Sequence, residues 1–332
     1  MKAVVVQRPG TANPLEVVDL PDPGDPQPGQ VRVRLHGSSL NFHDSLVIGD
    51  PATPVGHIPL ADGAGVVESV GAGVTGLAAG DAVVAAFTPQ WAAGPPTRDA
   101  FSSTAGIGTP GYAREVVITS AQHFTVAPHG WSHHESATLT VAGLTAWRAV
   151  IAEARIKPGD VVLVLGTGGV ATFAVQFAKM AGATVVVTSS SDAKLQRAQS
   201  LGADHLINYR LTPDWGHRVL ELTDGADLVV ELGGAGTLGR SIDAARVGAV
   251  ISLIGVLDGT AGAIPTGALT MKQIRLQGIV VGSRRHQRDM VHALDAQRVR
   301  PVVDRTFALD ELPTAVHYFR TAQHFGKVTL SW

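Results

Sequence analysis

Residues 161–174 read VVLVLGTGGVATFA, an apolar run followed by a glycine-rich turn and a helix-forming stretch. The run at 161–165 is typical of a strand buried on both faces of a parallel sheet. In the G-x-G-x-x-A turn, Gly166 permits the sharp bend, Gly168 leaves room for a pyrophosphate, and Ala171 lets the helix pack closely on the strand. The helix N-terminus offers N–H groups to phosphates. We predict a dinucleotide-binding turn whose cofactor contacts are Gly166, Thr167, Gly168, Gly169 and Val170.

The second apolar run, at 184–188, indicates which dinucleotide binds. A carboxylate at the end of this strand would hold the ribose 2′-hydroxyl of NAD and repel a 2′-phosphate. Here the run ends at Ser189 and Ser190, which are uncharged, and Lys194 follows. We therefore favour NADPH over NADH. Asp192 is expected to cap the next helix, and the alternative role for Lys194 is a solvated helix lysine.

The amino-acid composition limits which classes of function are possible. The chain has 332 residues, 38 Gly and no Cys, with 26 basic and 28 acidic residues. This length suggests two domains, and the absence of Cys excludes disulfides, Cys-ligated zinc and thiol nucleophiles. The near-neutral charge argues against nucleic-acid and membrane partners. No apolar run reaches about 18 residues, and the N-terminus lacks the apolar region of a signal peptide. We expect a cytoplasmic protein.

The pattern of elements changes near residue 130. Before it, Pro/Gly-rich turns separate short strands, and residues 88–111 read as one long loop. After it, apolar strands alternate with helical stretches at 135–153 and 170–181, which predicts a doubly wound parallel sheet. Asp310 is expected to cap a last helix at 310–322. The fold class is thus α/β, with a second, β-rich domain. The expected strands are 2–7, 15–20, 31–35, 64–70, 161–165, 184–188, 227–231, 249–254 and 327–331.

The chain resembles the medium-chain dehydrogenases/reductases, in particular the zinc-free quinone oxidoreductase and alcohol-dehydrogenase-like branch. The resemblance implies a GroES-like catalytic domain over 1–128 and 290–332, divided by a Rossmann domain over 129–289. The matching motifs, in the family's order, are NFHD at 41–44, PLADGAGVVESVG at 59–71, AGLTAW at 142–147, the turn at 166–171, LGAD at 201–204, GIVVGSR at 278–284 and HFGKV at 324–328.

The resemblance also assigns cofactor contacts. It places Thr145 near the nicotinamide or its phosphates, and Tyr209 beside the 2′-phosphate with Ser189, Ser190 and Lys194. The remaining implied contacts are Gly255, Val281, Gly282 and Ser283 at the carboxamide, with Phe325 and Lys327 closing over the cofactor. Each has a structural alternative, such as a strand end for Gly255 or a solvated charge for Lys327.

The sequence departs from the zinc alcohol dehydrogenases of this family. Their catalytic zinc is bound by a Cys at the position of Asn41, a His-Glu pair at Ala61 and Asp62, and a Cys at Val141. Their structural zinc uses four clustered Cys, and here the loop at 88–111 replaces that lobe. We therefore expect no zinc.

Loss of zinc favours conjugated acceptors. Hydride addition to a quinone or enone leaves its charge on a carbonyl oxygen that N–H groups can stabilise, whereas a simple ketone yields an alkoxide that usually needs a metal or an acid. The second hypothesis is a zinc-independent alcohol dehydrogenase or carbonyl reductase. The third is a structural protein that binds nucleotide without turnover.

Three residues are the candidates for catalysis. Asn41 can donate to the substrate carbonyl, and His43 is a possible general acid near neutral pH. The alternative for His43 is a packed or exposed imidazole, and for Asp44 a turn carboxylate that accepts backbone N–H bonds. In the family, the edge strand corresponding to residues 274–282 pairs across a two-fold axis, so we expect a homodimer.

Overall fold

A computed structural model describes residues 1–102, 104–297 and 299–332, which form two compact units. The first unit comprises Met1–Leu144 and Val281–Trp332, and the second comprises Thr145–Val280. Compared with the predicted boundaries, the first unit thus gains residues 129–144 and 281–289. Packing explains the difference: the His133 ring stacks on His36 with centroids 5.1 Å apart, and Gln287 donates from Nε2 to the Ala85 carbonyl at 2.9 Å.

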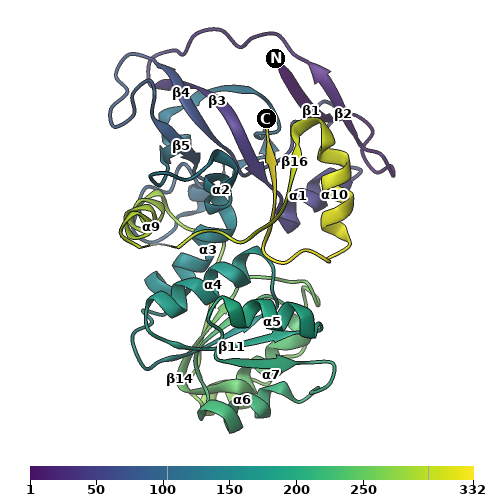
Figure 1. Cartoon of the computed structure of the whole chain (residues 1–332), viewed down its shortest axis with the longest axis vertical. Coiled ribbons are helices and arrows are strands. Elements are labelled where there is room, and N and C mark those ends of the chain that lie inside the picture. Colours follow the sequence, from purple (N-terminus) through teal and green to yellow (C-terminus); the bar gives the residue numbers. More distant parts are fainter. Residues whose placement is uncertain (103, 298) are drawn as a thin grey trace. The chain divides into compact units, whose positions relative to one another are not determined.

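The second unit is a doubly wound sheet with helices on both faces (Figure 1). Every neighbouring pair of strands is parallel. The order across the sheet is β12 (His205–Asn208), β11 (Thr184–Ser189), β10 (Val161–Leu165), β13 (Ala226–Glu231), β14 (Ala245–Leu253) and β15 (Arg275–Gly278). The helices are α4 (Gly169–Met180), α5 (Asp192–Ser200), α6 (Trp215–Thr223), α7 (Ala235–Ala244) and α8 (Thr266–Met271). This arrangement confirms the predicted Rossmann-type sheet.

Burial explains why the strands of this unit read as continuous apolar runs. Both faces of the sheet are covered, so Leu163, Val186 and Val229 are fully buried and need no polar alternation. β15 is the last strand of the sheet, at the edge where we predict pairing with a second copy. That pairing stays a prediction.

The first unit is built on a seven-stranded mixed sheet. Its order is β16 (Val303–Ala308), β17 (Lys327–Ser331), β3 (Gln30–Ser39), β4 (Ala64–Val70), β5 (Ala82–Ala85) and β9 (Phe124–Val126), with β8 (Val116–Ser120) also paired to β3. Two small sheets join β1 (Lys2–Val6) to β2 (Leu15–Asp19), and β6 (Thr104–Ala105) to β7 (Gly108–Thr109). The helices are α1 (Phe42–Gly49), α2 (His133–Ala137), α9 (Arg284–Ala296) and α10 (Leu312–Arg320), with 3₁₀ turns η1 (Arg98–Phe101), η2 (Ala121–His123) and η5 (Leu309–Glu311).

Two of the apolar clusters among the described residues stabilise the first unit. One joins β1, α1, α10 and β17 through residues such as Val4, Ile48 and Leu312, and Figure 1 shows α10 beside β1 and β16. The other lies under β3, β4 and β5 and contains Val33 and Tyr112. The first core holds the start of α1 and β17 in place, and this matters for the site described below.

The helical stretch expected at 135–153 is not one α-helix. It is divided into α2, a π-helix η3 (Leu139–Gly143), α3 (Leu144–Trp147) and a second π-helix η4 (Arg148–Glu153). The Gly143 N–H donates to the Thr138 carbonyl five residues back, at 3.1 Å. Residues 136–150 are all buried, so this stretch has no exposed face whose periodicity could reveal the wide turns.

Two predicted helix caps are wrong. Ser191, not Asp192, is the N-cap of α5, and its hydroxyl accepts the Lys194 N–H at 3.4 Å. Asp310 lies within η5 and not at the start of a helix, because η5 precedes α10 and places Glu311 at its N-cap. The predicted long loop at 88–111 contains η1, β6 and β7 as its regular elements. Within the described ranges, no helix is long and apolar enough to span a bilayer.

Candidate active site

The turn between β10 and α4 has the geometry of a phosphate cradle. Gly166 has φ of +80°, a conformation that favours glycine. Gly168 is the N-cap of α4 with an ordinary φ of −79°, and a Cβ built there would meet no atom within 4 Å. The chain itself therefore does not require glycine at 168. The space beside Gly168 is open at the N-terminus of α4, where free N–H groups favour an anion such as a phosphate.

The adenosine end of the predicted cofactor site lies at the carboxyl ends of β11 and β12. Ser189 pairs with Asn208 in the parallel ladder, and the Tyr209 N–H donates to the Ser189 carbonyl at 3.1 Å. The structure thus brings Ser189 and Tyr209 together, as the resemblance implies. Ser190 precedes the N-cap of α5 and Lys194 lies in the first turn of that helix, and both are partly exposed.

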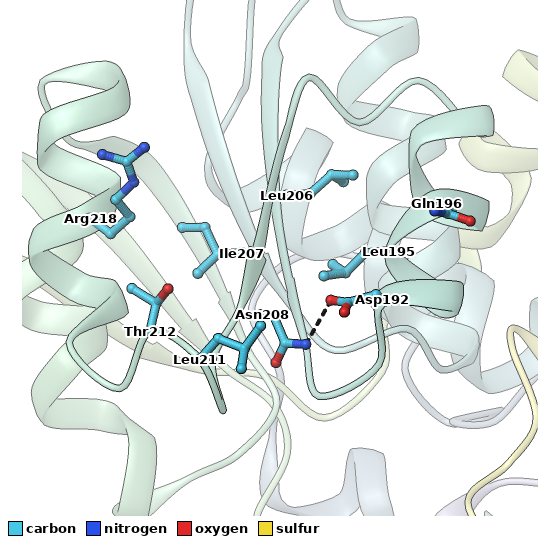
Figure 2. Close-up of a pocket in the computed structure, with 9 residues that line it drawn as sticks. All are labelled: Asp192, Leu195, Gln196, Leu206, Ile207, Asn208, Leu211, Thr212 and Arg218. Carbon is cyan, nitrogen blue, oxygen red and sulfur yellow. Dashed lines mark hydrogen bonds between the residues drawn. The ribbon is translucent and has the colours of Figure 1, made fainter.

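The carboxylate nearest this end is held by a neighbouring amide. Asn208 donates from Nδ2 to Asp192 at 2.7 Å (Figure 2), so this oxygen of Asp192 already accepts a hydrogen bond within the protein. The pair lines a pocket of about 450 Å³ between α5, β12 and α6, and Arg218 stands on its far side in the same view. The arrangement is compatible with an uncharged end to β11.

The residues that the resemblance assigns to the carboxamide lie where the backbone is closely packed or strained. A Cβ at Gly255 would overlap the Leu232 carbonyl oxygen, so this glycine is required by the fold. Val281 has φ of +45°, which is strained for a β-branched residue. Beside it, the Gly282 carbonyl accepts the Thr88 hydroxyl at 2.7 Å, and Ser283 caps α9. Gly255 and Thr145 belong to the second unit, and Val281, Gly282 and Ser283 to the first.

The catalytic candidates meet at the start of α1 in the first unit. Asn41 is the N-cap of this helix, and Asp44 Oδ2 accepts both the Asn41 backbone N–H at 2.8 Å and its Nδ2 at 3.2 Å. Asp44 Oδ1 accepts the Ala61 N–H at 3.1 Å and lies 3.3 Å from His43 Nε2. The Asp44 carboxylate is fully buried, whereas His43 is partly exposed, with its ring against Phe87.

This geometry shifts the pKa values of His43 and Asp44 in opposite directions. Burial favours the neutral imidazole of His43, but the Asp44 carboxylate outweighs burial and raises the pKa of His43 above its ordinary value. Burial likewise opposes ionisation of Asp44, yet His43 and the backbone N–H groups of Asn41 and Ala61 together lower its pKa. The pair is therefore arranged so that each group stabilises the charged form of the other.

A second buried carboxylate and a buried ammonium complete the cluster. Lys327, on β17, donates from Nζ to the Leu40 carbonyl at 2.7 Å and to Asn41 Oδ1 at 2.7 Å, and lies 3.3 Å from Asp62 Oδ2. The Ser39 hydroxyl also donates to Asp62 Oδ2. Burial raises the pKa of Asp62 despite the nearby ammonium. Among the described residues, no group donates to Asp62 Oδ1.

These contacts differ from the role that the resemblance implies for the C-terminal segment. Lys327 is 3% exposed and Phe325 is 1% exposed, so both side chains are packed within the first unit. Their closure over a cofactor stays a prediction. The sequence analysis aligned Asp62 with a zinc ligand of the family, but it counted neither Asp62 nor Ser39 among the catalytic residues. The available signal was a lone carboxylate in an otherwise apolar stretch at 58–67, since buried ionisable groups gather at functional sites.

Comparison with known proteins places the chain in a family. Residues 27–129 match the alcohol dehydrogenase GroES-like domain, and residues 169–296 match the zinc-binding dehydrogenase domain. A zinc-type alcohol dehydrogenase-like protein of Schizosaccharomyces pombe is 41% identical over 315 residues, covering 91% of each chain. A 2-haloacrylate reductase of Burkholderia sp is 30% identical over 332 residues, covering 92% of each. The crystal structure of an NAD-dependent alcohol dehydrogenase has a TM-score of 0.89 at 34% identity, covering 100% of both chains.

The chain therefore belongs to the medium-chain dehydrogenase/reductase superfamily, as its motifs predict. Its fold and relatives define it as an oxidoreductase that uses NAD(P)H. The predicted fold class and enzyme class are confirmed.

The residues at the catalytic zinc position of the family do not fit zinc. Asn41 Oδ1 and Asp62 Oδ2 both face the Lys327 ammonium, which would repel a dication. Ala61 and Val141 offer no ligand atom on their side chains. Over residues 1–102, 104–297 and 299–332, no three His, Asp or Glu side chains converge in a way that could hold a metal ion.

Substitution of Gly168 tests the cradle. We expect Gly168→Asp to abolish binding of NADPH and NADH, because a carboxylate would meet the pyrophosphate, and Gly168→Ala to weaken binding about tenfold or more. Since no atom lies near the new Cβ, stability should change by less than about 0.5 kcal/mol. Calorimetric titration and urea unfolding measure the two quantities. Gly239→Ala, also on open space, is the control, and undiminished binding by Gly168→Asp would contradict the assignment.

Proposed function

We propose that the chain is an NADPH-dependent reductase of conjugated C=C bonds or quinones that acts without zinc. The observation that carries this proposal is the cluster at Asn41, where an amide and an imidazole–carboxylate pair stand at the position of a metal site. A relative named for the reduction of 2-haloacrylate, a conjugated acceptor, gives further support.

The chemistry follows from what these groups can donate. When bound, NADPH supplies a hydride to the acceptor carbon conjugated with the carbonyl group. Addition there moves the C=C electrons onto the carbonyl oxygen, so the acceptor becomes an enolate. Asn41 Nδ2 stabilises this oxygen by a hydrogen bond that strengthens as negative charge develops. The His43 imidazolium, held by Asp44, supplies the proton that completes the reduction.

The charge of the acceptor explains why no metal is needed. An enolate spreads its charge over oxygen and carbon and is stabilised adequately by neutral donors, whereas an alkoxide concentrates the charge on one oxygen. The runner-up is a zinc-independent alcohol dehydrogenase or carbonyl reductase. The His43–Asp44 pair favours it to some degree, because a positioned acid can protonate an alkoxide directly.

A substrate panel tests the proposed function. Purified protein is mixed with NADPH or NADH and a quinone, an enone or an aldehyde, and loss of the reduced nicotinamide is followed by absorbance. We expect turnover with the enone or quinone, faster with NADPH, and no change after incubation with a chelator. Turnover with aldehyde alone would favour the runner-up. Loss of activity on chelation with recovery on adding zinc would overturn the zinc-free mechanism, and tight binding without any turnover would favour a structural role.

Cofactor preference should depend on the end of β11. We expect Ser189→Asp to raise KM for NADPH about tenfold or more and to leave or lower KM for NADH, because a carboxylate repels the 2′-phosphate and holds a 2′-hydroxyl. Lys194→Ala should raise KM for NADPH alone. Lys157→Ala, an exposed lysine of the same unit, serves as the control. If the ratio of KM for NADPH to KM for NADH is unchanged in both variants, the proposed preference for NADPH is contradicted.

His43 should impose a pH dependence on enone reduction. The imidazolium is the active form, so kcat should be highest below the raised pKa of His43 and fall as pH increases through it. The charged groups facing this ring are Asp44, Asp62 and Lys327. We expect His43→Gln to lower kcat by about 10²–10⁴-fold and to remove this fall. His129→Gln, at an exposed site, is the control, and an unchanged pH profile in His43→Gln would reduce His43 to a packing residue.

A further inference from the structure

All three N–H groups of the Lys327 ammonium have an oxygen partner within the protein. An ammonium carries three donors and no acceptor, and this one faces three oxygens: Leu40 O, Asn41 Oδ1 and Asp62 Oδ2. Its side chain is 3% exposed, so water does not replace any of these partners. Such a group organises its surroundings but cannot also donate to a substrate. Its effect must therefore act through one of the three residues that it holds.

Asn41 is the partner whose orientation the ammonium decides. At the other end of the same amide, Nδ2 donates to Asp44 Oδ2 at 3.2 Å. The amide cannot be reversed, because Nδ2 would then face an ammonium that accepts no hydrogen bond, and Oδ1 would face a carboxylate that donates none. Lys327 and Asp44 together fix which end of Asn41 carries its donors.

The backbone holds Lys327 against this amide. β17 pairs with β3 so that Thr329 lies opposite Ser39, and the Leu40 N–H donates to the Val328 carbonyl at 2.9 Å. Lys327 also donates from its own backbone N–H to the Val302 carbonyl at 2.8 Å. Backbone hydrogen bonds thus hold β17 on both sides of Lys327. From this fixed strand the ammonium contacts residues that are distant in the sequence.

We propose that Lys327 is a positioning residue that takes the place of the family's metal ion as the fixed positive centre of the site, and that it sets the Asn41 amide to donate to the substrate carbonyl oxygen. The proposal rests on the proposed function, because Asn41 contacts the acceptor only there. The competing explanation is a buried ion pair that stabilises the fold and nothing more.

The test removes the ion pair without leaving a lone charge. Lys327→Met alone would leave the Asp62 carboxylate buried without a cation, so the variant is Lys327→Met/Asp62→Leu. It is combined with Asn41→Ala in a cycle of four proteins, and kcat and KM are measured with NADPH and an enone. The control is Arg285→Met/Asp289→Leu, which removes an exposed pair on α9. Circular dichroism and NADPH binding report whether each protein is folded.

A positioning role predicts non-additive losses. We expect Asn41→Ala to lower kcat by about 10²-fold or more. The Lys327→Met/Asp62→Leu variant should lower kcat by about tenfold or more, with a smaller change in KM. In the Asn41→Ala background, the same two substitutions should lower kcat by less than about threefold further. Losses that multiply in the combined variant, or an unchanged kcat in Lys327→Met/Asp62→Leu, would overturn the proposal.

A second readout separates this proposal from the proposed function. The side-chain amide protons of Asn41, identified in nitrogen–proton NMR spectra by their loss in Asn41→Ala, should exchange more slowly than those of the exposed Asn13. In Lys327→Met/Asp62→Leu this protection should disappear, while in the α9 control it should remain. Protection that survives loss of Lys327 would overturn the positioning role. If the wild-type protein shows the protection but reduces no enone, the proposed function fails and the positioning of Asn41 stands.

Discussion

The burial of one ammonium group joins segments of the first unit that are far apart in the sequence. A lysine taken out of water is tolerated only when each of its N–H groups finds an oxygen, and at Lys327 the oxygens come from Leu40, Asn41 and Asp62. Removing one member of a buried pair of this kind typically costs about 3–5 kcal/mol, because the remaining charge stays buried. The end of β3, the start of α1 and the segment before β4 therefore cannot move independently of β17.

That constraint extends to the rest of the catalytic cluster. Because Lys327 takes Asn41 Oδ1, the amide nitrogen faces Asp44, and Asp44 in turn raises the pKa of His43. Two buried carboxyl groups thus lie in one cluster with an ammonium and an imidazole. The imidazole is the most exposed of these groups. His43 is therefore the group of this cluster that is placed to exchange a proton with a ligand, and Asp44, which is buried, holds it in position.

Sequence patterns predicted the second unit well because its determinants are local. The glycine turn at 166–168, the apolar strands and the serine at the end of β11 are each decided within a few residues. The cluster in the first unit depends on long-range contacts. Lys327 is separated in the sequence by 265 positions from Asp62 and by 286 positions from Asn41, and no local pattern contains such pairs. Lys327 read as a cofactor contact or a solvated charge, since nothing in the letters HFGKV indicates that its ammonium is buried. The cap at Ser191 was missed because Ser191 and Asp192 both satisfy the N-cap rule, and the cap at Glu311 was missed because η5 precedes α10.

The glycines separate what the fold requires from what a ligand requires. At Gly65 an added Cβ would overlap the Arg34 carbonyl oxygen, so the pairing of β4 with β3 accounts for this glycine without any function. At Gly168 an added Cβ meets nothing and the backbone is relaxed, so neither packing nor conformation accounts for the missing side chain. The residue lies where the first amides of α4 emerge, and a bound pyrophosphate supplies the steric reason that the chain lacks. A dinucleotide cofactor would thus explain a glycine that neither packing nor backbone conformation requires.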